Sequence, residues 1–260
     1  MANVIAISNQ KGGVGKTTTC YNLGACLVEL NQRVLVIDMD PQSNLTLAAG
    51  LDYDEVENTL VDLLDGGDEG KMDLQKVIHH TSLQGLDILP ADPRMARVER
   101  NLYELPDYET TLAKVIEPLK KQYDSIILDC PPTLSSLTLV AFYAADEVLI
   151  PVQCEYYAAK GLDLLLTIIS TVEKRCHRTI PWYLVVTLFD PRNKIHRTVY
   201  EQLTRNFSDH LMQTFIRMDT KLRECPIVGE PITVYAPTTR ASEQYRLLAQ
   251  EFDQRVTKEK

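Results

Sequence analysis

Runs of apolar residues alternate with longer amphipathic stretches along the whole chain. Several runs are continuous, among them Val34–Ile37 and Ile126–Leu128, and such runs are typical of strands buried on both faces of a sheet. The pattern predicts strands at residues 3–8, 33–38, 86–90, 124–129, 147–152 and 182–188, with 211–216 as a weaker candidate. It predicts helices at residues 16–31, 57–65, 93–102, 109–122, 137–145, 160–176, 196–210 and 240–256.

Strands that alternate with helices predict an α/β fold with a doubly wound, mostly parallel sheet and helices on both faces. In such folds a ligand binds beyond the carboxyl ends of the strands. The polar stretch at residues 65–73 is interpreted as a connection and not as a domain boundary. At 260 residues and 45% hydrophobic composition, one domain spanning 1–260 can bury a substantial core.

A glycine-rich segment with two lysines follows the first predicted strand. Residues 9–18 read Asn-Gln-Lys-Gly-Gly-Val-Gly-Lys-Thr-Thr, and a helical stretch comes directly after them. A strand, a glycine-rich turn and a helix N-terminus form an anion site, because backbone N–H groups point inward at the positive end of the helix dipole. Lys16 adds a full charge, and the Thr17 hydroxyl is placed to reach a Mg²⁺ ion shared with a nucleotide. The segment therefore predicts a nucleoside triphosphate site.

This loop departs from the ordinary pattern G-x-x-x-x-G-K-S/T, because Gln10 stands where that pattern requires glycine. A second lysine, Lys11, opens the loop. Since Lys16 already neutralises the terminal phosphates, an extra cation at the mouth of the loop could reach a phosphate on a facing subunit. The plainer alternative, a solvated surface lysine, stays open on spacing alone.

Acidic residues follow two other apolar strands. Asp38 and Asp40 end the second predicted strand, before Pro41, and Asp129 ends the strand at 124–129. A carboxylate at such a strand end can hold the water shell of Mg²⁺, and another can orient the water that attacks a phosphate. Acids also cap strand ends and helix starts without a catalytic role. Their position beside a phosphate loop favours the catalytic interpretation.

Composition narrows the class of protein. No apolar run approaches the ~20 residues that cross a bilayer, and the N-terminus shows no secretory signal. The 6 cysteines include no C-x-x-C pair, and the 5 histidines have no ligand spacing, which favours reduced core thiols over disulfides or zinc. These features predict a cytoplasmic protein.

Charge is unevenly distributed between the two parts of the chain. The whole chain carries a net charge of −9, yet residues 171–260 hold 15 Lys and Arg against 11 Asp and Glu, a net of +4. A basic patch on that part, doubled by dimerisation, could neutralise several phosphates of a nucleic acid without reading its sequence. The alternative, a moderately charged solvated surface, is not excluded by charge counts.

With these motifs in place, the chain resembles the ParA/Soj family of deviant Walker ATPases, P-loop NTPases of the SIMIBI type related to MinD and McdA. Four segments carry the resemblance: residues 9–18, 36–42, 128–132 and 151–157. The resemblance implies an ATP-dependent homodimer that binds double-stranded DNA non-specifically and is associated with the nucleoid. It also implies slow ATP hydrolysis stimulated by a ParB-like or organelle-specific adaptor, with no membrane partner.

The resemblance also implies roles for particular residues. Lys11, Lys16 and Asp40 are expected to be catalytic, with Lys11 acting across the dimer and Asp40 orienting the attacking water. Thr17, Asp38 and Asp129 are expected to hold Mg²⁺, Asp129 through water. The phosphate cradle is expected to consist of Lys11, Gly12, Gly13, Val14, Gly15, Lys16, Thr17 and Thr18.

The predicted DNA contact lies where the chain departs from the family pattern. Arg192 matches the basic residue that relatives commonly place near the strand at 182–188. Further on, the segment Ile216–Pro226 has Arg217 where many relatives have proline and Met218 where they have arginine. In relatives this segment lies over the adenine and near the DNA surface. The expected DNA-binding residues are Arg192, Arg217, Lys221 and Arg223.

Three rival functions share this fold. A MinD-like membrane ATPase needs an amphipathic C-terminal helix, and residues 253–260 have one strong apolar residue. A nitrogenase iron-protein relative needs cluster cysteines, and Cys130 lacks a second suitable ligand. A metabolic kinase or ligase would turn over its substrate without DNA. The cargo of a positioning ATPase, whether plasmid, chromosome or a protein organelle such as a carboxysome, is left open by the sequence.

Overall fold

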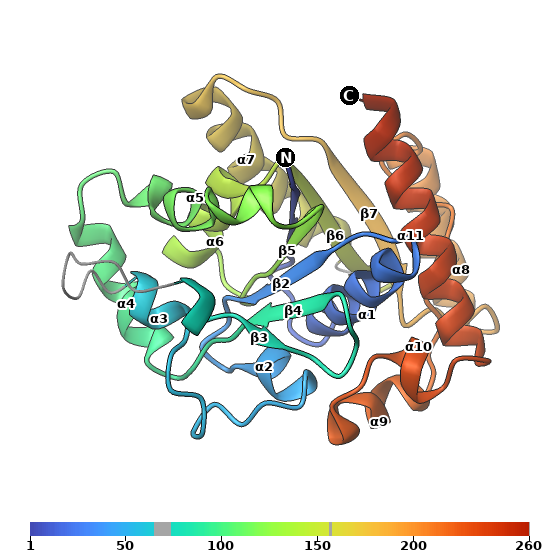
Figure 1. Cartoon of the computed structure of the whole chain (residues 1–260). Coiled ribbons are helices and arrows are strands. Elements are labelled where there is room, and N and C mark those ends of the chain that lie inside the picture. The colour runs from blue at the N-terminus through green and yellow to red at the C-terminus, as the bar shows by residue number, and fades with distance from the viewer. Residues whose placement is uncertain (65–73, 156–157, 260) are drawn as a thin grey trace.

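The computed structural model describes residues 1–64, 74–155 and 158–259; the predicted connection at 65–73 lies outside them. Seven strands form one sheet in the order β3-β4-β2-β5-β1-β6-β7 (Figure 1), and all neighbours are parallel except β3 and β4. The strands are β1 Asn3–Ile7, β2 Val34–Asp38, β3 His79–His80, β4 Leu86–Leu89, β5 Ser125–Asp129, β6 Glu147–Gln153 and β7 Trp182–Thr187.

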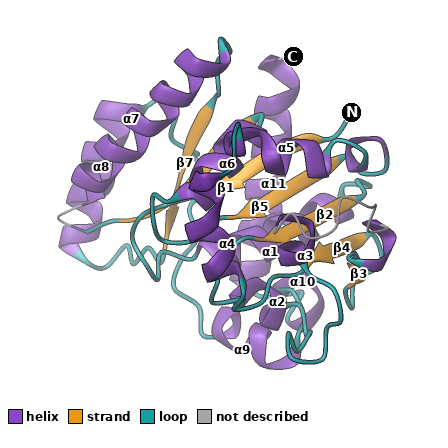
Figure 2. Ribbon diagram, turned by 90° about the vertical axis from the view of Figure 1, so that its left-hand side faces the viewer, coloured by secondary structure: helices purple, strands orange, loops and turns teal. Residues whose placement is uncertain are grey.

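Helices cover both faces of this sheet (Figures 1 and 2). They are α1 Lys16–Glu29, α2 Asn44–Ala48, α3 Leu60–Leu64, α4 Met95–Asn101, α5 Thr111–Ile116, α6 Ser136–Ala144, α7 Ala158–Cys176, α8 Lys194–Phe207, α9 Lys221–Val228, α10 Ile232–Tyr235 and α11 Arg240–Glu259. The predicted doubly wound, mostly parallel α/β sheet is thereby confirmed. A single domain over 1–260 stays a prediction.

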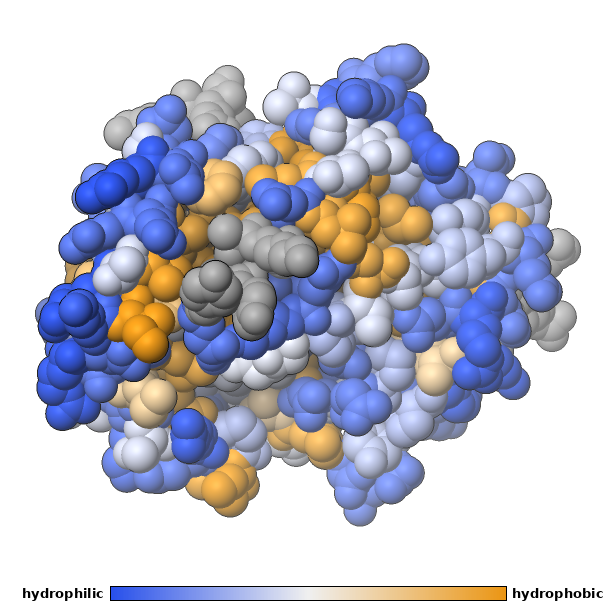
Figure 3. Space-filling view, turned by 180° about the vertical axis from the view of Figure 1, so that it is seen from behind, coloured by the Kyte–Doolittle hydropathy of each residue, from blue (hydrophilic) through white to orange (hydrophobic). Residues whose placement is uncertain are grey.

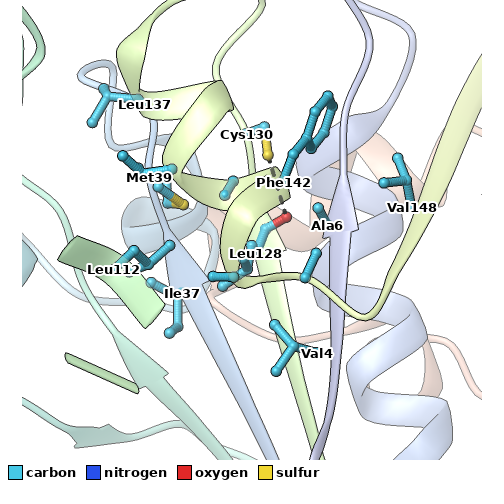
Figure 4. Close-up of a cluster of buried hydrophobic side chains, with 14 of the residues drawn as sticks. Val4, Ala6, Ile37, Met39, Leu112, Leu128, Cys130, Leu137, Phe142 and Val148 are labelled. Atoms are coloured by element: carbon cyan, nitrogen blue, oxygen red, sulfur yellow. Dashed lines mark hydrogen bonds between the residues drawn. The ribbon is translucent and has the colours of Figure 1, made fainter. Parts of the chain in front are cut away.

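Two apolar cores flank the sheet because successive strand side chains point to opposite faces. Val4 and Ala6 of β1 pack into the core covered by α3 to α7, whereas Ile5 and Ile7 pack into the core covered by α1 and α11. Figure 4 shows part of the first core, where the Cys130 thiol points toward the Leu128 carbonyl. Burial raises the pKa of Cys130, so this thiol is a packing residue.

The weaker strand candidate at 211–216 is wrong. These residues run beside β7 through isolated bridges from Leu184 to Leu211 and from Phe189 to Arg217. Between the bridges the N–H groups of Gln213 and Thr214 donate to the Glu251 carboxylate of α11, at 2.7 and 2.9 Å. Met212 and Ile216 still donate to the carbonyls of Leu184 and Val186 at 2.8 Å, but Glu251 takes the Thr214 N–H between them, so the ladder of a regular strand is interrupted.

The helix predicted at 109–122 is interrupted. It forms α5 with short 3₁₀ turns at Tyr108–Thr110 and Leu119–Lys121. Pro118 has no N–H to donate to the preceding turn, which ends the α-helical hydrogen bonding there. The short elements β3, α2, α9 and α10 had no predicted counterpart. Among the described residues, no helix is long and apolar enough to cross a membrane.

The sheet brings the predicted site residues to one edge. In the parallel register Asp129 of β5 lies opposite both Ile7 of β1 and Asp38 of β2. The loops that follow these three strands therefore start side by side. The glycine-rich loop, the Asp38–Asp40 turn and the Asp129 turn meet at the carboxyl edge.

Candidate nucleotide site

The glycine-rich loop has the backbone that its glycines permit. Gly13 and Gly15 lie in the left-handed region, with φ of +74° and +86°, which costs little without a Cβ. Among the described residues other than the chain neighbours of each glycine, no heavy atom lies within 4 Å of the place where a Cβ would sit at Gly12, Gly13 or Gly15. The loop therefore surrounds open space, as a phosphate cradle requires.

Side chains from β6 and β7 hold the loop against the sheet. The Gln153 Nε2 donates to the Gly13 carbonyl at 3.0 Å, and the Thr187 hydroxyl donates to the Val14 carbonyl at 2.7 Å. Asn9 accepts the Lys11 N–H at 3.0 Å and donates to the Pro151 carbonyl at 2.7 Å. These bonds turn two loop carbonyls toward the sheet and away from an anion in the cradle.

The two lysines of the loop lie in different environments. Lys16 is buried, its Nζ donates to the Lys11 carbonyl at 3.3 Å, and burial lowers its pKa against the opposing field of Asp129. Lys11 is half exposed, and its Nζ lies 2.6 Å from a Glu155 carboxylate oxygen. Lys16 is thus buried within the loop, whereas Lys11 is exposed, and the roles assigned to the two lysines stay predictions.

Asp38 positions the segment that carries Asp40. Its Oδ1 accepts the Asp40 N–H at 3.0 Å, and its Oδ2 accepts both the N–H and the hydroxyl of Thr46 at 2.8 Å. Burial raises the pKa of Asp38 to about 6, while the bonds from Thr46 act in the opposite direction. With these partners Asp38 fixes the geometry of both the Asp40 turn and α2.

Asp129 is a buried carboxylate with few partners. It is 1% exposed, and apart from hydrogen bonding from the Thr17 side chain no described residue satisfies its oxygens. Burial and the neighbouring Asp38 raise its pKa, while Thr17 and Lys16 act in the opposite direction. Buried polar atoms are normally satisfied, so these oxygens are suited to a metal-bound water.

A cavity of about 640 Å³ extends from the loop to α9. Its walls include the predicted residues of the cradle, except Lys11 and Val14, together with Asp40. Asp38 and Asp129 are not among its lining residues and lie buried at the carboxyl edge. The wall away from the loop is largely apolar, with contributions from Leu47, Ala48, Leu222, Cys225, Pro226 and Ile227. An anion-binding cradle joined to an apolar wall fits a nucleotide, whose phosphates are anionic and whose base is largely apolar.

Sequence reasoning assigned no role to the residues that tie this wall to the loop. The Asn22 Oδ1 accepts the Ile232 N–H at 2.6 Å, and its Nδ2 donates to the Thr18 carbonyl at 2.8 Å. The Tyr21 hydroxyl donates to the Gly229 carbonyl at 3.1 Å. The sequence feature that could have indicated these contacts is Asn22, a polar residue within the apolar face of α1. Its partner Ile232 lies 210 residues away in the sequence.

The four predicted DNA-binding residues lie in two places. Arg192 follows β7 and forms an ion pair with Asp190 at 3.0 Å, and Arg217 is on the segment that pairs with Phe189. Lys221 and Arg223 are on α9, where Lys221 pairs with Glu224 at 2.7 Å. Leu222 lies between them and lines the cavity. The segment at 216–226 therefore reaches the nucleotide cavity; Tyr156 and Tyr157 of the 151–157 motif lie outside the described residues.

Comparisons with known proteins agree with this geometry. Residues 2–181 match the family described as AAA domain. The chain is 40% identical over 252 residues to the sporulation initiation inhibitor protein Soj of Bacillus subtilis, covering 96% of this chain and 98% of that protein. It is 38% identical over 258 residues to the chromosome partitioning protein ParA of Myxococcus xanthus, covering 99% and 90%.

Solved structures share the fold over nearly the whole chain. Cobyrinic acid a,c-diamide synthase from Mycobacterium smegmatis, with a bound ATP analogue and magnesium, superposes with a TM-score of 0.82 at 30% identity, covering 96% of this chain and 93% of that one. Apo McdA from Cyanothece superposes with a TM-score of 0.84 at 21% identity, covering 96% and 99%, which shows the fold alone. From its loop, its sheet and these relatives, the chain belongs to the ParA/Soj family of P-loop ATPases.

Proposed function

We propose that the protein is an ATP hydrolase that dimerises with ATP and Mg²⁺, binds DNA and positions an intracellular cargo. The cavity carries this proposal, because it joins an open glycine cradle and buried Lys16 to an apolar wall of the size a nucleoside needs. The bound ATP analogue and magnesium in a relative at 30% identity support the same ligands here.

The residues fit a magnesium-bound triphosphate. The cradle N–H groups and Lys16 would bind the phosphates, the Thr17 hydroxyl would hold the metal, and Asp129 would hold a water of its shell. The buried, poorly satisfied oxygens of Asp129 support this role, and Asp38 fixes the neighbouring turn by accepting the N–H groups of Asp40 and Thr46. When bound, Mg²⁺ would neutralise charge on the phosphates during transfer.

Asp40 would orient the attacking water. It is 7% exposed, lines the cavity, and its Oδ1 accepts the Gln42 N–H at 2.9 Å. A carboxylate held by backbone bonds at a cavity wall can accept a proton from a water and fix its direction. We expect hydrolysis to be slow and stimulated by a cargo adaptor.

The dimer would be completed by Lys11. Its ammonium lies at the mouth of a site where Lys16 already supplies one buried cation. An added cation that reaches the triphosphate of a facing subunit would make ATP binding and pairing one event. ATP would then shift the equilibrium from monomer to dimer, because the two states differ in their affinity for ATP.

DNA would bind to the basic part of the chain, through Arg192, Arg217, Lys221 and Arg223. The net charge of +4 over residues 171–260 supports this placement, and phosphate contacts alone give binding without sequence preference. The protein would act in the cytoplasm on the nucleoid, without a membrane partner. The relatives named for chromosome partitioning and Soj support a plasmid or chromosome as cargo over a protein organelle.

A metabolic ligase is the second candidate, because the relative with 30% identity is named as an amide-forming synthase. That function predicts ATP turnover that depends on a small carboxylate substrate and does not respond to DNA. The higher identity to Soj, 40%, favours the positioning function.

Charge reversal on the basic part is expected to abolish DNA retention. In Arg192→Glu/Lys221→Glu, affinity for DNA with ATP and Mg²⁺ should fall at least ~100-fold, because each dimer loses four cations and gains four anions near phosphates. Nucleotide affinity should stay unchanged. Fluorescence anisotropy with random duplexes, measured across salt concentrations, checks this result.

The control is Arg100→Glu/Lys121→Glu, which makes the same charge change at exposed positions outside residues 171–260. It should retain most of the DNA affinity. Equal losses in both variants, or unchanged retention in the first, would remove the assignment of these residues.

A further inference from the structure

Lys11 is held by two side chains of its own chain. Its Nζ lies 2.6 Å from the Glu155 Oε2 and donates to the Gln153 Oε1 at 2.9 Å. Both partners come from the end of β6, more than 140 residues away in the sequence. The lysine at the loop mouth therefore has a defined position without any facing subunit.

The same β6 end also fixes the loop. The Gln153 Nε2 donates to the Gly13 carbonyl at 3.0 Å while its Oε1 accepts from Lys11. The Glu155 N–H donates to the Gln153 carbonyl at 2.8 Å, which places the Glu155 side chain beside Lys11. Seen from behind, the surface of the molecule is a mixture of polar and apolar side chains (Figure 3). The contact is thus organised by backbone and loop geometry, and not by chance proximity of two long side chains.

We propose that Glu155 is a positioning residue that holds Lys11 in cis and so opposes ATP-dependent dimerisation. The inference depends on the proposed role of Lys11 across the dimer. When Lys11 moves toward a phosphate of the facing subunit, it gives up its 2.6 Å contact with the Glu155 carboxylate, and the loss of that ion pair opposes pairing. Gln153, which is uncharged, keeps the loop in place while Lys11 moves.

The ion pair between Lys11 and Glu155 is weak enough to break and form again. The side chains of Lys11 and Glu155 are 46% and 56% exposed, and exposed pairs of this kind stabilise weakly and are screened by salt. A triphosphate carries more negative charge than one carboxylate, so it wins the competition when it is present. Two pairs break for each dimer formed, which doubles the effect on the dimerisation equilibrium.

Glu155→Gln is expected to dimerise more readily than the wild type. With Mg²⁺ and a slowly hydrolysed ATP analogue, the dimer dissociation constant should fall roughly 3- to 30-fold at low salt, from two weak pairs per dimer. The difference should shrink as ionic strength rises. Sedimentation velocity over a protein concentration series measures both quantities.

The control is Glu117→Gln, since Glu117 is 63% exposed and also pairs with a lysine, Lys120, at 3.3 Å. It should dimerise like the wild type at every salt concentration. Unchanged or weaker dimerisation of Glu155→Gln, while the wild type dimerises, overturns the inference. A wild type that stays monomeric instead contradicts the proposed function.

Discussion

Replacing Lys16 by alanine is expected to abolish nucleotide binding, with a loss of affinity for ATP of at least ~100-fold. Lys16 is buried beside the cradle, with its Nζ 3.3 Å from the Lys11 carbonyl. Removing it leaves a desolvated anion site without its cation, and an uncompensated buried charge costs several kcal/mol. Isothermal titration with ATP and with ADP in Mg²⁺ measures this effect.

Lys11→Ala is the matched variant, because it removes a second lysine from the same loop. Lys11 is half exposed and pairs with Glu155, so its loss should change affinity of the monomer for ADP less than about threefold. Dimerisation with ATP should be lost. Equal losses of ADP affinity in both variants would mean that Lys11 acts within its own subunit.

Replacing Asp40 by alanine is expected to reduce ATP turnover at least ~100-fold while ATP binding and dimerisation persist. Asp40 lines the cavity, and its backbone and side chain are fixed by bonds from Asp38 and to Gln42. Orientation of a water and acceptance of its proton each contribute on the order of 10²-fold or more. Phosphate release under single-turnover conditions checks the chemical step.

The Asp40→Asn variant removes the negative charge of this side chain and keeps its shape. The amide oxygen can keep the bond from the Gln42 N–H, yet it accepts a proton poorly, so this variant should be as slow as Asp40→Ala. Asp52→Asn, in an acidic turn outside the cavity, should turn over ATP at the wild-type rate. Wild-type turnover in either Asp40 variant would show that another group orients the water.

The sheet and the loop were predictable because their signals are local. The continuous apolar runs at 34–37 and 126–128 predict buried strands, and both form in the centre of the sheet. The conformation of residues 9–18 could be predicted from the local sequence, because the spacing of the glycines determines where the backbone can curve around an anion. The candidate at 211–216 failed because Glu251, a distant side chain, takes two backbone donors.

The rest of the site depends on contacts between distant segments. Much of the apolar wall is on α9, whose eight residues include Pro226 and show no clear helical periodicity. Asn22 and Tyr21 find their partners only when α1 packs against α10 and Gly229. The Lys11–Glu155 pair likewise joins two elements that meet only in the folded sheet. The spacing of residues along the sequence does not indicate contacts between distant segments.

The state of association of the wild-type protein tests the central claim most directly. With saturating Mg²⁺ and a slowly hydrolysed ATP analogue, sedimentation equilibrium should give twice the chain mass of 29.5 kDa, and with ADP it should give that mass once. Lys11→Ala should give the single mass with both nucleotides. A wild type that binds the analogue yet keeps the single mass would contradict the account.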